Sequence, residues 1–229
     1  MYNEQAIIRE SAQALSDYMS ENFDDYEIIF SNDGSTDSCG DIVKQMQLPN
    51  VRVIENAQNM GKGYAVRAAM LAAEGDVVMF TDADLAYGTD VICQVRDTFE
   101  SQPETKVLIG SRNLSKDGYE GYTFIRRIAS KTYIRVLCAV GGFKLSDSQC
   151  GCKAFSGDAA KAIFSRCEVN RFAFDFECIL WASKLGMNIQ EMPVKVINHR
   201  ESKVSVVKDA IKMLRDVSKM KKRIKNVEI

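Results

Sequence analysis

The chain has 229 residues and an almost balanced charge, and these two properties exclude several classes of protein. Its 30 Lys and Arg residues against 31 Asp and Glu residues give a net charge of −1, so the charge does not favour nucleic acid as a partner. His199 is the single histidine, which argues against a zinc site and against a Ser/His/Asp hydrolase. No apolar run approaches the roughly 20 residues needed to span a bilayer, and no basic-then-apolar signal peptide is recognisable.

The seven cysteines are scattered without the spacing of a disulfide framework, which favours buried thiols in a reducing compartment. Cys150 and Cys152 flank a glycine, but no second pair accompanies them, so a metal site there is disfavoured. The hydrophobic content of 46% is ample for a core. The length fits one large α/β domain or two small ones, and no repeat or linker divides the chain.

Short apolar runs alternate with segments of helical periodicity along the chain, which is typical of an α/β domain. The predicted strands are 26–30, 51–55, 77–80, 106–110, 153–155 and 187–196, with Pro193 indicating an edge position or a bulge in the last one. The predicted helices are 4–20, one through Val43 and Met46, 61–72, 89–100, one around 126–131, 172–185 and a tail from 206. The first helix follows Tyr2-Asn3-Glu4 directly, whereas a strand is expected before it, so we expect an N-terminal truncation or a misplaced start.

The stretch from Gly75 to Leu85 organises the chain. Its apolar run, residues 77–80, is typical of a strand buried on both faces of a parallel sheet. Asp82 and Asp84 follow at the carboxyl end, where open α/β sheets bind their ligands. Two carboxylates on one tight turn can bind a hard divalent cation together with phosphate oxygens, so the pair predicts a metal–diphosphate site. A surface turn with two solvated acids is the alternative.

Other polar turns provide further candidates. Asp33 ends a predicted strand and lies beside the two aspartates, although a plain capped turn would have the same composition. Gly61-Lys62-Gly63 opens a helix and suggests phosphate cradling, with Lys62 facing a diphosphate, but this motif alone is weak. Arg126 and Ser130 share a helical face that suits a phosphate, and an ordinary solvated face is the competing explanation.

These stretches occur together with several more in a fixed order. They are YNE at 2–4, SNDGSTD at 31–37, NMGKGYA at 59–65, TDADL at 81–85, GSR at 110–112, DSQCGCKAF at 147–155, FAFDFE at 172–177, GMNIQEMPV at 186–194 and ESKVS at 201–205. The series resembles the family-2 glycosyltransferases of GT-A fold, and specifically their polyprenyl-phosphate (dolichyl-phosphate) hexosyltransferases. The resemblance implies a Rossmann-like, mixed and mostly parallel sheet flanked by helices, here lacking the first strand. Ala86 replaces a glutamine common among the mannose-using members, which makes the chain more similar to dolichyl-phosphate glucosyltransferases.

The resemblance implies an inverting transfer of a hexose, expected to be glucose from UDP-glucose, to a polyprenyl phosphate. Asp82 and Asp84 would hold Mg²⁺ or Mn²⁺, with Asp84 also catalytic, and Asp147 would be the carboxylate near the anomeric carbon. The donor-binding residues implied are Tyr2, Asn3, Glu4, Asp33, Lys62 and Asp82. The cations and hydroxyl expected around the acceptor phosphate are Arg112, Arg126, Ser130, Arg200 and Lys203.

Two other functions remain open at this point. A saccharide hydroxyl as acceptor, as in cell-surface polysaccharide synthesis, would need Asp147 as a true general base. A chain without its first strand would also suit a catalytically impaired binding or assembly partner. A nucleotidyltransferase is disfavoured because its glycine loop should follow the first strand, not the third.

The domain boundaries follow from the same pattern. Residues 1–205 form the expected glycosyltransferase domain, and 206–229 form a basic amphipathic helix of the same domain. Because the expected acceptor is a lipid, this helix is predicted to contact a membrane surface, with a membrane-anchoring subunit as the alternative. The expected location is cytoplasmic and peripheral on the membrane, and the sequence leaves the oligomeric state and the pathway open.

Overall fold

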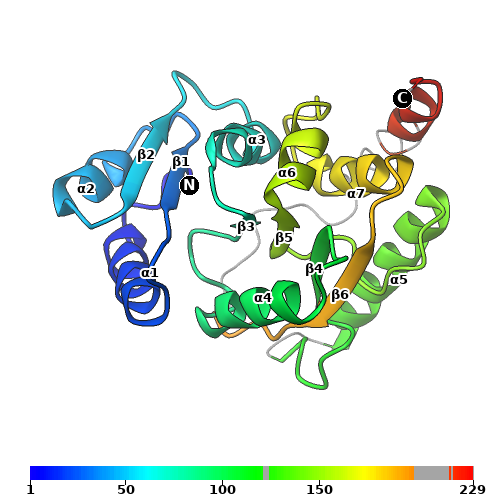
Figure 1. Cartoon of the computed structure of the whole chain (residues 1–229), viewed down its shortest axis with the longest axis horizontal. Helices are drawn as coiled ribbons and strands as arrows, with labels where there is room; N and C mark the ends of the chain where they lie inside the picture. The colour runs from blue at the N-terminus through cyan, green and yellow to red at the C-terminus, as the bar shows by residue number, and fades with distance from the viewer. Residues whose placement is uncertain (121–123, 199–216, 218, 229) are drawn as a thin grey trace.

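A computed structural model describes residues 1–120, 124–198, 217 and 219–228. The helices are α1 (Ile8–Asn22), α2 (Cys39–Met46), α3 (Lys62–Ala72), α4 (Asp90–Ser101), α5 (Phe124–Gly141), α6 (Gly157–Phe164) and α7 (Phe174–Lys184). The strands are β1 (Ile28–Asn32), β2 (Val51–Glu55), β3 (Val77–Phe80), β4 (Val107–Ser111), β5 (Lys153–Ser156) and β6 (Ile189–Pro193). The strands lie in the middle of the molecule with helices around them (Figure 1).

The strands form two hydrogen-bonded sheets. β1 and β2 pair in parallel, and the second sheet has the order β3-β5-β4-β6. Within it β5 is antiparallel to both β3 and β4, whereas β4 and β6 are parallel. The sheet is therefore mixed, as predicted, and β6 with Pro193 is an edge strand, as predicted.

The two sheets are not bonded to each other, and within the described residues no strand lies in the ladder between β1 and β3. Met1 is hydrogen-bonded to the end of β1. Its amino group donates to Ser31 O (2.7 Å), and its carbonyl accepts from Asp33 N (3.0 Å). This is the bonding pattern of a parallel neighbour, so Met1 runs alongside the end of β1.

Alternating side chains place the core on both faces of the larger sheet. Val78, Phe80 and Phe155 belong to the main core cluster, which also contains residues of α6 and α7. Their neighbours Leu108 and Ala154 point to the opposite face, where α4 packs with Val91 and Val95. A third cluster, separate from these two, joins α1, α2 and β1. Helix α3 contacts both β1 and β3 and so connects the two sheets (Figure 1).

The strand predicted to be buried on both faces is only partly so. Val78 and Phe80 of β3 are buried, but Val77 is 39% exposed. The prediction of a fully buried parallel strand is therefore wrong. The physical reason is that β3 is an edge strand, which among the described residues is hydrogen-bonded only to β5, and β5 is antiparallel to it. Phe80 is nevertheless fixed by Phe155 and Phe174, with ring centroids 6.2 and 5.7 Å away.

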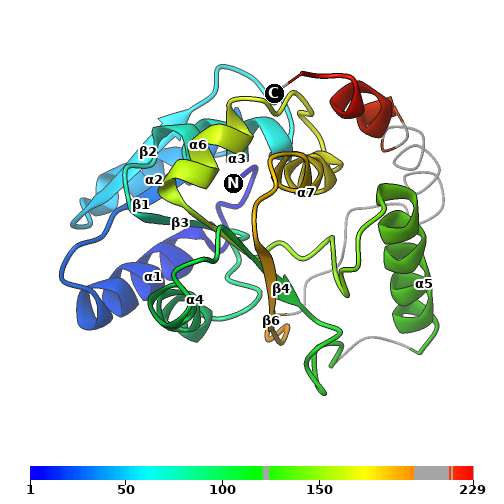
Figure 2. The ribbon, with the colours of Figure 1, turned by 45° about the vertical axis from the view of Figure 1, so that its right-hand side comes forward.

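The C-terminal helix packs against the domain. Val217, Met220 and Ile224 are buried in the main core cluster. Lys221 Nζ donates to Val140 O of α5 (2.8 Å), and Lys184 Nζ of α7 donates to Lys225 O (3.4 Å). Figure 2 shows this terminal segment beside α7 and near the end of α5. The apolar side of the described tail is thus occupied by protein, and a membrane contact would have to use its basic side chains. Among the described residues, none of the helices has the length and apolarity that a membrane span requires.

Candidate active site

The carboxyl end of β3 places two carboxylates on a turn with a strained backbone. Asp82 and Asp84 directly follow the strand, and Leu85 has a positive φ of 49°, which is unfavourable for a branched side chain. Asn198 stabilises this turn because its side-chain amide donates to Asp84 O (3.0 Å) and Leu85 O (3.2 Å). The segment after β6 therefore holds the turn that carries both predicted metal ligands.

Lys62 lies against this turn and forms an ion pair with Asp82. Burial alone would lower the pKa of Lys62, but its pKa is raised because the carboxylates of Asp82, Asp175 and Asp84 surround the ammonium group. Lys62 is thus a permanent cation near the predicted diphosphate position. The sequence predicted this residue at the site but not its partner.

The glycines flanking Lys62 have a packing role that the sequence did not predict. A Cβ on Gly61 or Gly63 would overlap Asn170 O or Val169 O, so the glycines allow the 169–170 segment to pack against the start of α3. Tyr64 N also donates to Asn170 O (3.2 Å). These carbonyls occupy the space on the Cβ side of both glycines, and binding of a phosphate at this turn stays a prediction.

Asp33 connects β1 to the same glycine turn. Its carboxylate is buried and accepts hydrogen bonds from Asn56 Nδ2 (3.1 Å), Met60 N (2.9 Å) and Gly61 N (2.8 Å). Asp33 therefore orders the turn before Lys62.

The YNE segment packs on the turn after β1. Asn3 N donates to Ser35 Oγ (3.0 Å), and Asn3 Oδ1 accepts from Thr36 N (2.9 Å). Glu4 O accepts from the first turn of the following helix, whereas the Tyr2 side chain is 41% exposed. The two motifs expected to bind the nucleotide are thus joined to each other at the end of β1.

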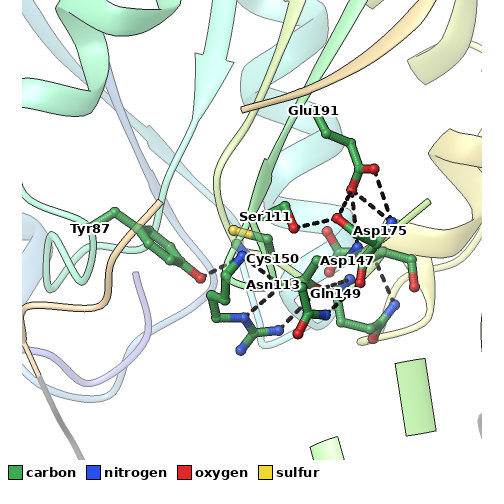
Figure 3. Close-up of polar contacts among 12 residues, drawn as sticks. Tyr87, Ser111, Asn113, Asp147, Gln149, Cys150, Asp175 and Glu191 are labelled. Carbon is green, nitrogen blue, oxygen red and sulfur yellow. Dashed lines mark hydrogen bonds and ion pairs between the residues drawn. The ribbon is translucent and has the colours of Figure 1, made fainter. Parts of the chain in front are cut away.

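The second half of the site is an ion pair between Arg112 and Asp147. Arg112 Nε and Nη2 donate to Asp147 Oδ2 (2.7 Å) and Oδ1 (3.1 Å), and Gln149 N donates to Oδ1 (3.1 Å) (Figure 3). The side chain of Asp147 is fully buried and that of Arg112 is 12% exposed. Burial would lower the pKa of Arg112, but the Asp147 carboxylate raises it well above the usual value. Such two-point pairs are among the strongest hydrogen-bonded contacts in proteins.

The segment that follows Asp147 closely approaches the turn that carries the predicted metal ligands. Gly151 N donates to Tyr87 OH (3.1 Å), and Cys150 O accepts from the buried Lys153 Nζ (2.6 Å). Lys153 also pairs with Asp175 (2.5 Å). Burial raises the pKa of Cys150 to about 11, so its thiol is protonated near neutral pH.

A substitution at Gly151 should displace Asp82. A Cβ at this position would overlap Asp82 Oδ2, so we expect Gly151→Ala to weaken donor and metal binding by about tenfold or more, the loss of one interaction with a charged group. The measurement is calorimetric titration with UDP and Mn²⁺. Gly186→Ala is the control, because its added Cβ meets no atom within 4 Å and only its φ of +67° is strained. Equal affinities for the wild type and Gly151→Ala would contradict the close approach.

The acceptor-side residues are described only in part. Three cations lie over the ring of Tyr119: Arg112 (5.5 Å), Arg127 (5.9 Å) and Lys131 (5.4 Å to the centroid). Ser130 lies on α5 between the last two. The side chains of Arg126, Arg200 and Lys203 are outside the described part of the chain.

Several residues of the site were not predicted from the sequence. They are Tyr87, Asn113, Ser146, Lys153, Asp175, Glu191 and Asn198. Asp175, Glu191 and Lys153 lie inside motifs that were recognised, but a carboxylate or amine in a strand or helix carries no local signal of its partner. Lys153 and Asp175 are 22 residues apart in the sequence, and Ser146 and Glu191 are 45 residues apart.

Asp82 and Asp84 have the ligand atoms that a hard divalent cation prefers, but two carboxylates do not fill its coordination shell. Asp82 and Asp84 supply carboxylates on one turn, and oxygen is the atom that Mg²⁺ and Mn²⁺ prefer. Among the described residues, no cluster of three or more His, Cys, Asp or Glu side chains could complete a metal site without other ligands. The pair therefore suits a metal that takes its remaining ligands from a diphosphate and water.

Solved structures show the class to which this fold belongs. Glucosyl-3-phosphoglycerate synthase from Mycobacterium tuberculosis, in complex with UDP, superposes with a TM-score of 0.69 and 18% identity, covering 100% of this chain and 79% of that one. Mannosyl-3-phosphoglycerate synthase from Rubrobacter xylanophilus gives a TM-score of 0.68 at 14% identity, covering 100% and 74%. The chain thus has the GT-A glycosyltransferase fold.

The family follows from the sequence comparison. The sequence profile of the family described as glycosyl transferase family 2 matches residues 1–164. The chain therefore belongs to this family. A dolichyl-phosphate beta-glucosyltransferase of Trichomonas vaginalis is 30% identical over 231 residues, covering 93% of this chain and 70% of the relative. The enzymes of that name from Dictyostelium discoideum and Saccharomyces cerevisiae are also 30% identical, covering 86% and 84% of this chain. The chain spans 63% of the length of each of those two relatives.

Proposed function

We propose that the protein transfers glucose from UDP-glucose to a polyprenyl phosphate, with inversion at the anomeric carbon. The names of the relatives support this acceptor and this sugar. The structural observation that carries the proposal is the engagement of both Asp147 oxygens by Arg112. A carboxylate held in this way is a poor free base, whereas an acceptor phosphate is already ionised near pH 7 and needs none.

The donor side would be held by charge. Asp82 and Asp84 would bind Mg²⁺ or Mn²⁺, which would stabilise the negative charge of the departing diphosphate. Lys62 would contact the same diphosphate, because its ammonium group adjoins Asp82. Asp33 and the segment Tyr2-Asn3-Glu4 would bind the nucleoside from the end of β1. A neighbour of the same fold has been crystallised with Mn²⁺ and UDP-glucose, which supports this arrangement.

The acceptor side requires cations, since two anions must be brought together. Arg112, Arg126, Ser130, Arg200 and Lys203 remain the residues proposed for the acceptor phosphate. The positions of Arg127 and Lys131 over the Tyr119 ring add two further positive charges on the α5 side. Asp147 would orient Arg112 toward the phosphate and would support charge at the anomeric carbon.

A donor and acceptor screen tests this function. The protein is supplied with Mn²⁺ or Mg²⁺ and either UDP-glucose or GDP-mannose, and with a short polyprenyl phosphate, the matching polyprenol or an oligosaccharide. We expect glucosylated polyprenyl phosphate as the product, detected by mass spectrometry. Transfer to the oligosaccharide alone would establish the polysaccharide function instead. UDP binding without turnover in any combination would establish a binding partner.

We further propose that the protein acts at the cytoplasmic surface of a membrane, where its lipid acceptor resides. Lys222 and Lys225 are exposed on the tail, while Met220 and Ile224 are buried. The seven thiols, all free, suit a reducing compartment. The tail would therefore be attracted to the membrane electrostatically, through basic side chains near anionic headgroups.

Removing two tail charges should weaken vesicle binding. We expect Lys222→Ala combined with Lys225→Ala to lower the partition constant by about thirtyfold at low salt, since each Lys contributes about 1 kcal/mol near an anionic surface. The measurement is co-sedimentation with phosphatidylserine-containing vesicles at low and high salt. Lys44→Ala, on α2, is the control. Unchanged binding would favour a membrane-anchoring subunit.

A further inference from the structure

Glu191 lies on β6, yet its carboxylate reaches the segment that carries Asp147. In the β4–β6 ladder it is the register partner of Ile109. Ser146 N donates to both carboxylate oxygens at 2.9 Å, and Ser146 Oγ and Asp147 N donate to Oε1 at 2.7 and 3.1 Å (Figure 3). One side chain therefore accepts four hydrogen bonds from two consecutive residues.

The remaining polar groups of Ser146 are bound to the end of β4. Ser146 Oγ lies 2.6 Å from Ser111 Oγ, and Ser146 O accepts from Asn113 Nδ2 at 2.6 Å. Ser111 and Asn113 flank Arg112, so the segments that carry Arg112 and Asp147 are joined on both sides of that ion pair. Glu191 holds the joined segments to β6.

We propose that Glu191 is a positioning residue, which fixes the backbone of Ser146 and Asp147 so that the Asp147 carboxylate meets Arg112 at two points. The inference rests on the proposed function, because that function gives the Arg112–Asp147 ion pair a role in catalysis. Arg112 N also donates to Asp147 Oδ2 (3.3 Å), so the pair depends on the register of the two backbones as well as on their side chains. Displacements of about 1 Å at such a site can lower rates by about a hundredfold.

The chemistry of the contact requires a carboxylate. Three donor groups, Ser146 N, Ser146 Oγ and Asp147 N, converge on Glu191 through four hydrogen bonds, and an ionised carboxylate accepts at both oxygens. A glutamine at position 191 retains one acceptor oxygen and directs an NH₂ group at a donor. It should therefore preserve part of the contact, while alanine removes all of it.

The test combines Glu191 variants with a change at Asp147. We expect Glu191→Ala to lower kcat by about a hundredfold and Glu191→Gln by about tenfold, the range for hydrogen bonds to a charged group, with the KM for UDP-glucose within about twofold of wild type. In an Asp147→Asn background, Glu191→Ala should lower kcat by less than about threefold, because residues that act as a unit are not additive. Single turnovers with radiolabelled UDP-glucose make the slow variants measurable.

A matched control separates positioning from a general loss of stability. Glu27→Gln changes another carboxylate that accepts a backbone N–H, from Glu74, at the start of β1. It should lower Tm without changing kcat. Additive effects of Glu191→Ala and Asp147→Asn would overturn the proposal, as would an equal loss of kcat in Glu27→Gln. If Glu191→Ala does not fold, the same double-mutant cycle with Asp147→Asn is measured with Glu191→Gln.

The proposed function and this inference fail in different ways. Turnover by the wild-type protein shows which acceptor is used. The double-mutant cycle of Glu191 and Asp147 is then measured with that acceptor. If the wild type does not turn over, hydrogen exchange at the amides of Ser146 and Asp147 is the readout. Exchange there should be at least about tenfold faster in Glu191→Gln, with UDP affinity unchanged, and equal exchange in both proteins would overturn the inference.

Discussion

Replacement of Asp84 by alanine should abolish metal-dependent binding of the nucleotide-sugar donor. Asp84 follows β3 on a turn whose backbone is held by Asn198, so the backbone that carries its carboxylate is fixed in place. Without it, a divalent cation between the diphosphate and the protein would keep only Asp82, which is already paired with Lys62. We expect the Kd for UDP in the presence of Mn²⁺ to rise at least about a hundredfold, since a metal contributes several kcal/mol of charge stabilisation.

The control for this variant lies on the same segment. Asp76→Ala removes an exposed carboxylate at the opposite end of β3 and should leave UDP affinity unchanged. Titrations with and without Mn²⁺ give the metal-dependent part of the affinity directly. If Asp84→Ala kept full activity and full dependence on Mn²⁺, Asp84 would not belong to the site.

The sequence predicted the positions of the strands well because their ends carry chemical signals. The strand over 51–55 is β2, and 77–80 is β3, while β1 and β4 begin two and one residues later than predicted. Turn residues and carboxylates bound these short apolar runs. Helix α6, Gly157–Phe164, was missed, whereas α2, also of eight residues, was expected because Ser35, Thr36 or Asp37 before it could cap a helix.

The contacts within the site could not be predicted because they join distant residues. Gly-Lys-Gly before α3 has the composition of a phosphate cradle, and only the tertiary structure shows that Asn170 O lies where a side chain on Gly61 would be. Likewise, Arg112 and Asp147 were each recognised from a motif, but their pairing across 35 residues was not. A motif identifies which residue types are present, whereas the partner of a buried charge depends on how the strands are ordered.

The pairing of Arg112 with Asp147 leads to the prediction with the other large effect. Asp147→Asn should lower the free energy of unfolding by about 3–5 kcal/mol, because a buried guanidinium would lose its counter-charge. We also expect kcat to fall at least about a hundredfold, since the amide cannot hold Arg112 at two points. Arg112→Lys should not preserve activity, because an ammonium group lacks the planar fork. Denaturant unfolding and single-turnover kinetics measure the two effects.

The pH dependence distinguishes this role of Asp147 from general base catalysis. The folded-state pKa of Arg112 is raised above its unfolded-state pKa, which itself lies far above neutrality, so the stability that its ion pair contributes is complete at neutral pH and is lost only in strongly alkaline solution. Titration of Arg112 should therefore leave kcat level between about pH 6 and 9. Asp158→Asn is the control: it breaks an exposed pair with Lys106, and such pairs contribute about 0–1 kcal/mol. A wild-type kcat that rises with a single carboxylate ionisation, lost in Asp147→Asn, would contradict the role proposed and would favour a hydroxyl acceptor.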